Sequence, residues 1–312
     1  MKLGFLYAGQ GSQRVGMGAD LYEAYPAFRD AFDSAKVDFD LKETCFTDAE
    51  GHLNQTRYTQ PCMVAFAAGV TAVLRQKGIT PDIAAGLSLG EYSALHAAGV
   101  FPAKTAIELV AVRGRAMEEA AKGVESAMVA VLGLEREKLQ KACEEAADAG
   151  VVAIANYNCP GQIVIGGEKA AVDRAVILAK EAGAKRCLPL KVSGPFHTPL
   201  MAPAGAALEA HFQTIPFAAP TIPVIFNFLG DVKGEETSIP ALLVRQVQSS
   251  VYMEDSIRKM AAMGVDALVE IGPGKALSGF ARKIVPEVPI YAVETAADVD
   301  ALVEALGKET NP

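Results

Sequence analysis

IAAGLSLGEYSALHAA, residues 83–98, runs from an apolar segment into a helical pattern through the pentad GLSLG at 86–90. The pentad fits G-x-S-x-G, in which a serine occupies a sharp turn between a strand and a helix. Glycines at both ends cannot clash in such a turn, so Ser88 can adopt strained backbone with its hydroxyl exposed. The first amides of the following helix would point at the same place, where an oxyanion forms. The stretch predicts a nucleophilic serine, and a serine that only caps the helix is the alternative.

Strands and helices alternate along much of the chain on both sides of this stretch. Apolar runs and helical periodicity predict strands at 2–7, 82–86, 222–227, 266–271 and 289–292, and helices at 18–35, 59–77, 102–121, 240–248, 255–263, 275–284 and 298–306. Strands that alternate with helices form a parallel sheet with helices on its faces. The larger part of the chain is therefore predicted to be an α/β fold with a mainly parallel sheet.

The segment 125–192 has a different order of elements. Its patterns predict a strand, a helix, two strands, a helix and a strand at 127–132, 135–149, 151–155, 162–165, 169–182 and 185–190. This β-α-β-β-α-β order is that of a ferredoxin-like unit. We predict a small ferredoxin-like subdomain at 125–192, inserted into a large catalytic subdomain made of 1–124 and 193–312, with the active site in the cleft between them.

Composition narrows the class of protein. The chain has 312 residues, 51% of them hydrophobic, and a net charge of −8 that disfavours binding to nucleic acid. The apolar run at 63–74 is too short to span a bilayer, and residues 1–8 lack the pattern of a secretion signal. The five cysteines have no metal-ligand spacing. We expect a cytoplasmic protein with no nucleic-acid or membrane partner and no metal site.

A serine nucleophile needs a base, and the four histidines lie in different settings. His96 follows Ser88 by eight residues on one helix, about 12 Å along the axis, which is too far for a hydrogen bond. His197 lies in the Gly/Pro-rich loop 193–199, whose rigid, non-helical backbone can aim a side chain into a cleft. His197 is the favoured base, and an inert loop histidine is the alternative. The other two histidines are His52, which lies in a polar segment, and His211, which lies at a helix end.

The sequence GQG at 9–11 follows the first predicted strand. It does not fit the dinucleotide motif G-x-G-x-x-G, because the third glycine would fall at Arg14. We interpret this loop as the source of one oxyanion-hole amide, beside the amide of Leu89. An ordinary glycine-rich turn is the alternative.

Arg113 lies on or near the apolar stripe of the helix at 104–121, three or four residues after Leu109 and Val110. A buried arginine needs an anionic partner, so in a serine enzyme it indicates a clamp for a substrate carboxylate. A solvated arginine is the alternative, and Arg115 fits that description.

Eight short motifs follow one another along the chain: GQGSQ (9–13), GLSLGE (86–91), RGR (113–115), NYN (156–158), PGQ (160–162), FH (196–197), VRQ (244–246) and EIGPG (270–274). In this order the chain resembles the malonyl-CoA:acyl-carrier-protein transacylases, the acyltransferases that load the carrier in fatty-acid and polyketide synthesis. The resemblance covers residues 5–292. It implies an α/β-hydrolase-like core with an inserted ferredoxin-like β-α-β-β-α-β subdomain, which agrees with the element order above.

The resemblance also implies roles for individual residues. Ser88 becomes the nucleophile and His197 the base, and the backbone amides that hold the oxyanion are those of Gln10 and Leu89. Arg113 holds the malonyl carboxylate. The backbone carbonyl of Gln246 orients the histidine, which is the role of the acidic residue in a hydrolase triad. Two further residues support the site, Asn156 and Phe196.

Phe196 bears on specificity, because a bulky ring crowds an α-methyl branch and so favours malonyl over methylmalonyl. The chain departs from the common family pattern at two places. Leu87 stands where many members have histidine, and Tyr252 stands where tryptophan is common. Neither position belongs to the catalytic pair, so neither departure changes the assignment.

The implied function is ping-pong transfer of malonyl from malonyl-CoA to the phosphopantetheine thiol of acyl carrier protein, through a malonyl-serine intermediate, in fatty-acid biosynthesis. No cofactor is required, and we expect a monomer. The alternatives are a malonyl transacylase that serves a polyketide pathway and a serine hydrolase or thioesterase. A non-catalytic carrier-docking subunit is disfavoured because both Ser88 and His197 are present.

Overall fold

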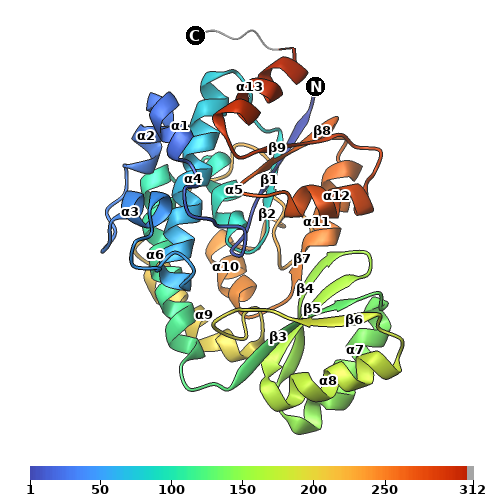
Figure 1. Cartoon of the computed structure of the whole chain (residues 1–312). Coiled ribbons are helices and arrows are strands. Elements are labelled where there is room, and N and C mark those ends of the chain that lie inside the picture. Colours follow the sequence, from blue (N-terminus) through green and yellow to red (C-terminus); the bar gives the residue numbers. More distant parts are fainter. Residues whose placement is uncertain (308–312) are drawn as a thin grey trace. The chain divides into compact units, whose positions relative to one another are not determined.

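A computed structural model describes residues 1–307 of the chain, whose elements are labelled in Figure 1. These residues form two compact units. Unit 1 comprises Met1–Gly114, Pro216–Ile225 and the described residues from Ile257 onward, and unit 2 comprises Arg115–Ile215 and Phe226–Ser256. The sequence predicts a narrower subdomain, at 125–192, and those limits stay a prediction.

Unit 1 is built on a four-stranded sheet in the order β2-β1-β8-β9. All of its pairings are parallel, which confirms the predicted α/β class. β1 pairs residue by residue with both neighbours, so that Tyr7 lies opposite Gly86 on one side and Ile271 on the other. The loops that follow these three residues therefore leave the same edge of the sheet, the edge at which open α/β sheets bind ligands. The strands are β1 (Leu3–Tyr7), β2 (Ile83–Gly86), β8 (Ala267–Ile271) and β9 (Ile290–Val293).

Helices cover this sheet, and β1, β2 and β8 are buried along their whole length, as expected of parallel strands in an α/β fold. α5 packs against β1 and β2, and α12 and α13 both pack against β9, an arrangement that Figure 1 shows. The helices of this part of the chain are α1 (Ala19–Ala24), α2 (Pro26–Phe32), α3 (Leu41–Phe46), α4 (Thr56–Gln76), α5 (Gly90–Ala97), α6 (Ala103–Ala121), α12 (Ala276–Ile284) and α13 (Ala296–Ala305).

Two local predictions in unit 1 are wrong, and proline explains both. The helix predicted at 18–35 is two helices, because Pro26 begins α2 and cannot continue the hydrogen bonding of α1. The strand predicted at 222–227 forms only isolated bridges, from Val224 to Ala84 and from Phe226 to Asp231. Pro223 lies beside the first bridge and has no amide to donate to a ladder.

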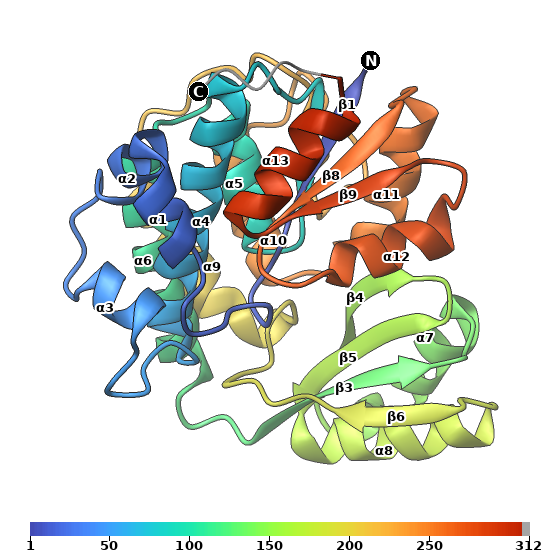
Figure 2. The ribbon, with the colours of Figure 1, turned by 45° about the horizontal axis from the view of Figure 1, so that its top comes forward.

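Unit 2 contains a five-stranded sheet in the order β6-β3-β5-β4-β7, of which Figure 2 labels β3 to β6. β3 through β6 follow the predicted order β-α-β-β-α-β, and their pairings are antiparallel. β7 adds to the sheet parallel to β4. The strands are β3 (Ser126–Leu132), β4 (Val152–Cys159), β5 (Gln162–Glu168), β6 (Arg186–Pro189) and β7 (Val251–Tyr252).

The two long helices of this sheet, α7 (Arg136–Ala146) and α8 (Lys169–Glu181), pack against each other and share one apolar core with its strands. The remaining helices of this part of the chain are α9 (Ala202–Phe212), α10 (Ile239–Val247) and α11 (Met253–Ala262), with short 3₁₀ turns η1 (Ala147–Ala149) and η2 (Pro199–Met201). No helix among residues 1–307 has the length and apolar character to cross a membrane.

The turn between β2 and α5 has no room for side chains at its two glycines. A Cβ on Gly90 would lie 2.2 Å from the carbonyl oxygen of Tyr7, and one on Gly86 would lie 2.1 Å from the carbonyl carbon of Gly90. We expect Gly90→Ala to lower the free energy of unfolding by at least about 2 kcal/mol, because rigid backbone must move. Gly279→Ala is the control, because a Cβ there meets open space. Urea unfolding of both variants gives the two values, and equal stabilities would contradict this account of the turn.

Candidate active site

Ser88 lies at the turn between β2 and α5 with a φ of 51°. A positive φ is uncommon outside glycine and persists only where the surroundings enforce it. Here the amide of Leu87 donates to the Tyr7 carbonyl at 2.9 Å, and the amide of Gly90 donates to the Leu87 carbonyl at 2.9 Å. These bonds fix the turn on both sides of Ser88. The pentad therefore adopts the strained strand-turn-helix geometry that its sequence predicts.

Leu89 immediately precedes the first residue of α5. The amides of the first helical turn have no partner within the helix, and the helix dipole adds partial positive charge at the same end. An oxyanion that forms on a substrate attached to Ser88 would lie at this end of α5. The amide of Leu89 is thus suitably located for the oxyanion-hole role that the resemblance implies.

The loop that carries Gln10 touches this turn directly. A Cβ on Gly9 would lie 2.5 Å from the carbonyl oxygen of Leu87, so the two backbones are in close contact. The side chain of Gln10 is held by α4: its Nε2 donates to Oγ1 of Thr56 at 2.9 Å, and its Oε1 accepts from Nε2 of Gln60 at 3.4 Å. These side-chain bonds hold Gln10 at the start of α4, in a loop that touches the turn of Ser88.

Arg113 comes to the same place from α6. It is the largest fully buried side chain among residues 1–307, and its Nη2 donates to Oγ of Ser88 at 3.2 Å. Burial lowers the pKa of Arg113, against the attraction of neighbouring Tyr92 and Glu91, but a guanidinium remains charged in proteins. The site therefore holds a permanent positive charge beside the nucleophilic oxygen. Arg115, two residues later, is exposed.

Close helix packing positions Arg113. A Cβ on the next residue, Gly114, would lie 2.9 Å from the Cα of Arg57 and 2.9 Å from the carbonyl oxygen of Thr56. α6 can approach α4 this closely only with glycine at that position. Gly114 thus brings the helix that carries Arg113 against the same helix end that anchors Gln10.

His197 lies in unit 2 and is buried, with a φ of 60°. Its Nδ1 lies 2.8 Å from the carbonyl oxygen of Gln246, and its amide donates to the carbonyl of Val247 at 3.2 Å. A carbonyl only accepts, so Nδ1 carries the proton in the neutral ring and Nε2 is left as the acceptor. This is the tautomer that a general base needs.

The carbonyl that orients His197 is itself fixed. Gln246 is fully buried at the end of α10, and its Nε2 donates to Oδ1 of Asn227 at 3.5 Å. The carbonyl of Asn227 in turn accepts from the amide of Tyr252 at 2.9 Å. A main-chain acceptor on a helix end, braced by a buried polar network, can orient an imidazole without any carboxylate.

The two supporting residues also belong to unit 2. Phe196 is buried immediately before His197, and a Cβ on Gly194 would lie 3.0 Å from Cε1 of its ring. Asn156 lies on β4 opposite Val251 of β7. The predicted site residues thus belong to both units. Four are in unit 1, namely Gln10, Ser88, Leu89 and Arg113, and four are in unit 2, namely Asn156, Phe196, His197 and Gln246.

The histidines that sequence analysis set aside have contacts of their own. The ring of His96 is hydrogen bonded to the carbonyl of Phe101 at 3.0 Å, and burial lowers its pKa. His52 stacks on Tyr58 with ring centroids 4.7 Å apart. His96 thus ties the end of α5 to the next turn, which is a structural role.

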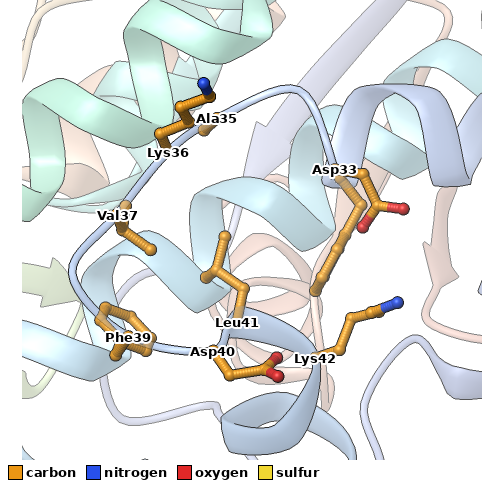
Figure 3. A pocket seen from close by; sticks show the side chains of 9 residues that line it. Asp33, Ala35, Lys36, Val37, Phe39, Asp40, Leu41 and Lys42 are labelled. Atoms are coloured by element: carbon orange, nitrogen blue, oxygen red, sulfur yellow. The ribbon is translucent and has the colours of Figure 1, made fainter.

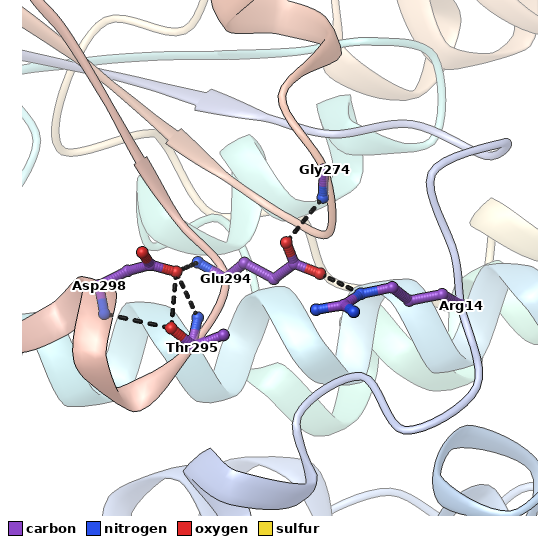
Figure 4. Close-up of polar contacts among 5 residues, drawn as sticks. All are labelled: Arg14, Gly274, Glu294, Thr295 and Asp298. Atoms are coloured by element: carbon purple, nitrogen blue, oxygen red, sulfur yellow. Dashed lines mark hydrogen bonds and ion pairs between the residues drawn. The ribbon is translucent and has the colours of Figure 1, made fainter.

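One set of contacts around the Gln10 loop could not be found from the sequence. Arg14 donates through Nε to the carboxylate of Glu294, which also accepts from the amide of Gly274 at 3.1 Å. Figure 4 shows these bonds beside the capping box of Thr295 and Asp298 that begins α13. The loops after β1, β8 and β9 are therefore joined by one carboxylate. Arg14 and Glu294 are 280 residues apart in the chain, beyond the reach of any local pattern.

The described residues also form a surface pocket of about 410 Å³ between the end of α2 and α3, shown in Figure 3. Its lining comes from Phe32 to Lys42 and includes none of the predicted site residues. No group of three or more His, Cys, Asp or Glu within residues 1–307 is arranged to hold a metal ion. The group of residues around Ser88, which includes Gln10, Leu89 and Arg113, is therefore a better candidate site than this pocket.

Comparisons with known proteins agree on one family. A family model described as an acyl transferase domain matches residues 4–298. The malonyl CoA-acyl carrier protein transacylase of Bacillus subtilis (strain 168) is 42% identical over 314 residues, with 99% of each chain covered. The enzyme of the same name from Escherichia coli (strain K12) is 43% identical over 305 residues, covering 96% of this chain and 98% of its own.

Solved structures give the same result. The crystal structure of MCAT from Streptococcus pneumoniae matches with a TM-score of 0.93 and 47% identity, covering 97% of this chain and 100% of that chain. A malonyl-transacylase in complex with a type II PKS acyl-carrier protein matches with a TM-score of 0.93 and 40% identity, covering 98% of this chain and 100% of that chain.

The bond from Gln10 to Thr56 supplies a prediction for the site's framework. Thr56 is fully buried, so Thr56→Val removes the acceptor of Gln10 Nε2 at almost constant volume. We expect a loss of about 0.5 to 1.5 kcal/mol in the free energy of unfolding, the usual contribution of one hydrogen bond, because Nε2 of Gln10 is only partly buried. Thr56→Ser retains the hydroxyl and should lose less than half as much. Equal losses in the two variants, measured by urea unfolding, would show that the hydroxyl does not matter.

Proposed function

The chain belongs to the acyl transferase family and, within it, to the malonyl CoA-acyl carrier protein transacylases, and we propose that it transfers malonyl from malonyl-CoA to the phosphopantetheine thiol of an acyl carrier protein. Identity above 40% over nearly the whole length supports this assignment. The observation that carries it is the buried Arg113, whose guanidinium donates to Oγ of Ser88. A fixed positive charge at the nucleophile suits an acyl group that ends in a carboxylate.

The proposed reaction has two half-reactions at Ser88. In the first, Oγ attacks the thioester carbon of malonyl-CoA while Nε2 of His197 takes the hydroxyl proton. The carbon–sulfur bond then breaks, CoA leaves with that proton as a thiol, and malonyl remains as an ester on Ser88. In the second, the carrier's thiol gives its proton to His197 and attacks the ester, and Ser88 recovers the proton as it leaves.

Each half-reaction passes through a tetrahedral oxyanion. We assign its stabilisation to the backbone amides of Gln10 and Leu89, since donors fixed before the reaction need not reorganise during it. The Gln246 carbonyl, 2.8 Å from Nδ1 of His197, holds the ring proton on Nδ1, so that Nε2 can exchange protons, and it supports the imidazolium that forms. Phe196 and Asn156 support the pocket, with Phe196 crowding an α-methyl branch.

We propose the pathway, the location and the assembly state from the same family membership. We assign the protein to fatty-acid biosynthesis in the cytoplasm, acting as a monomer, with no nucleic acid or membrane among its partners. The net charge of −8 supports the exclusion of nucleic acid. A serine hydrolase is the other function that the elbow permits, but hydrolysis gives no reason for a buried arginine at the nucleophile.

Transfer to a carrier tests the function, and His197 tests the mechanism. Purified protein mixed with malonyl-CoA and a phosphopantetheinylated carrier should form malonyl-carrier much faster than free malonate. His197→Ala should reduce this transfer by at least roughly 100-fold, the lower end for a general base. His211→Ala is the control, because that residue has no assigned role. A folded His197→Ala enzyme with near-normal transfer would rule out His197 as the base, and dominant release of malonate would favour a hydrolase.

Arg113 tests the assignment of malonyl as the acyl group. Removal of one member of a buried, hydrogen-bonded charge pair costs about 2 to 5 kcal/mol, so Arg113→Ala should lower kcat/KM for malonyl-CoA roughly 30-fold to several thousand-fold. Lysine should not restore it fully, because it lacks the planar fork. Acetyl-CoA has no carboxylate, so its transfer should be spared. Equal losses on the two substrates would show that Arg113 does not select malonyl, and Arg115→Ala on the same helix is the control.

A further inference from the structure

Tyr92 is a fully buried residue of α5 that the reaction described above does not use. It lies in the first turn of α5, the helix that begins two residues after Ser88. The guanidinium of Arg113 contacts both side chains: its Cζ lies over the Tyr92 ring, 5.3 Å from the ring centroid, and its Nη2 is 3.2 Å from Oγ of Ser88. The nucleophile and an aromatic ring thus contact the same cation.

An aromatic ring supports a buried guanidinium in a way that a carboxylate cannot. The negative face of the ring attracts the cation, and the attraction is strongest where water is excluded. Burial raises the pKa of the Tyr92 phenol, so this ring remains neutral. The neutral ring adds no negative charge beside Arg113, on which the charge of Glu91 already acts. A further carboxylate in place of the ring would compete with the substrate's carboxylate.

The ring also restricts orientation. Arginine is planar and stacks on aromatic faces, which leaves the N–H groups at its edge pointing sideways from the ring. A carboxylate is bound best by two parallel N–H groups from such an edge. The guanidinium of Arg113 is held at two points, over the Tyr92 ring and at Oγ of Ser88, and these two contacts limit its rotation.

We propose that Tyr92 is a positioning residue that determines acyl specificity: its ring face holds the guanidinium of Arg113 beside Ser88, and the enzyme therefore prefers acyl thioesters that end in a carboxylate. The proposal rests on the proposed function, because it needs Arg113 to bind the substrate's carboxylate. Acyl groups without a carboxylate gain nothing from the arrangement, so loss of the ring should affect the two classes of substrate differently.

The test is the ratio of kcat/KM for malonyl-CoA to that for acetyl-CoA. Tyr92→Leu removes the ring face and should lower this ratio roughly 10- to 30-fold, the range for a desolvated cation–π contact. Tyr92→Phe keeps the ring and should keep the ratio within about threefold of wild type. Phe28→Leu is the matched control, since Phe28 is equally buried but its ring packs on those of Phe32 and Phe66. That variant should lose stability without a change in the ratio.

A fluorinated series keeps the test valid if Tyr92→Leu does not fold. Phenylalanines with one, two and three ring fluorines at position 92 retain the shape of the ring and progressively weaken its negative face. The ratio should fall stepwise along the series, and a constant ratio would overturn the proposal. It would also be overturned if Tyr92→Phe lost as much selectivity as Tyr92→Leu, or if Tyr92→Leu lowered both activities equally.

The Arg113→Ala variant distinguishes a failure of the proposed function from a failure of the role proposed for Tyr92. If that variant does not change the ratio, the carboxylate clamp is wrong and the proposal for Tyr92 fails with it. If Arg113→Ala changes the ratio but neither Tyr92→Leu nor the fluorinated series does, only the role of Tyr92 is wrong.

Discussion

The contact between the end of β1 and the turn after β2 is the constraint on which the rest of unit 1's site depends. Parallel pairing places Tyr7 opposite Gly86, and the carbonyl of Tyr7 then fills the space in which a side chain at position 90 would lie. The chain can leave β2 only through a tight turn, and Ser88 takes a positive φ as a result. The strain at the nucleophile is thus imposed by the sheet, and the start of α5 is fixed by the same contact.

Burial of a positive charge is the second physical condition. A lone guanidinium inside a protein is unfavourable unless its surroundings compensate. The hydroxyl of Ser88, the ring of Tyr92 and the nearby charge of Glu91 all act on Arg113. A positive charge supported in this way beside the nucleophile suits an acyl group that ends in a carboxylate.

Local patterns were sufficient to predict the parts of the fold and site that depend on backbone geometry. The glycines at 86 and 90 indicated the turn, and helical spacing placed Arg113 on the buried stripe of α6, where the structure also has it. Pro26 and Pro223 could have corrected the helix at 18–35 and the strand at 222–227, since both lack the amide that those elements need. Tyr92 could also have been noticed in the sequence, because it lies four residues after Ser88. Its contact with Arg113, however, depends on the position of α6 in the tertiary fold. The bond between Arg14 and Glu294 depends entirely on the tertiary fold.

The central claim is that Ser88 carries the malonyl group between the two thiols. Its most direct test is the intact mass of the protein after brief incubation with malonyl-CoA, followed by peptide mapping. The account predicts a mass increase of one malonyl group in the wild type, located on the peptide that contains Ser88, and no increase in Ser88→Ala. An unmodified wild-type protein that still transfers malonyl, or an adduct that persists in Ser88→Ala, would contradict it.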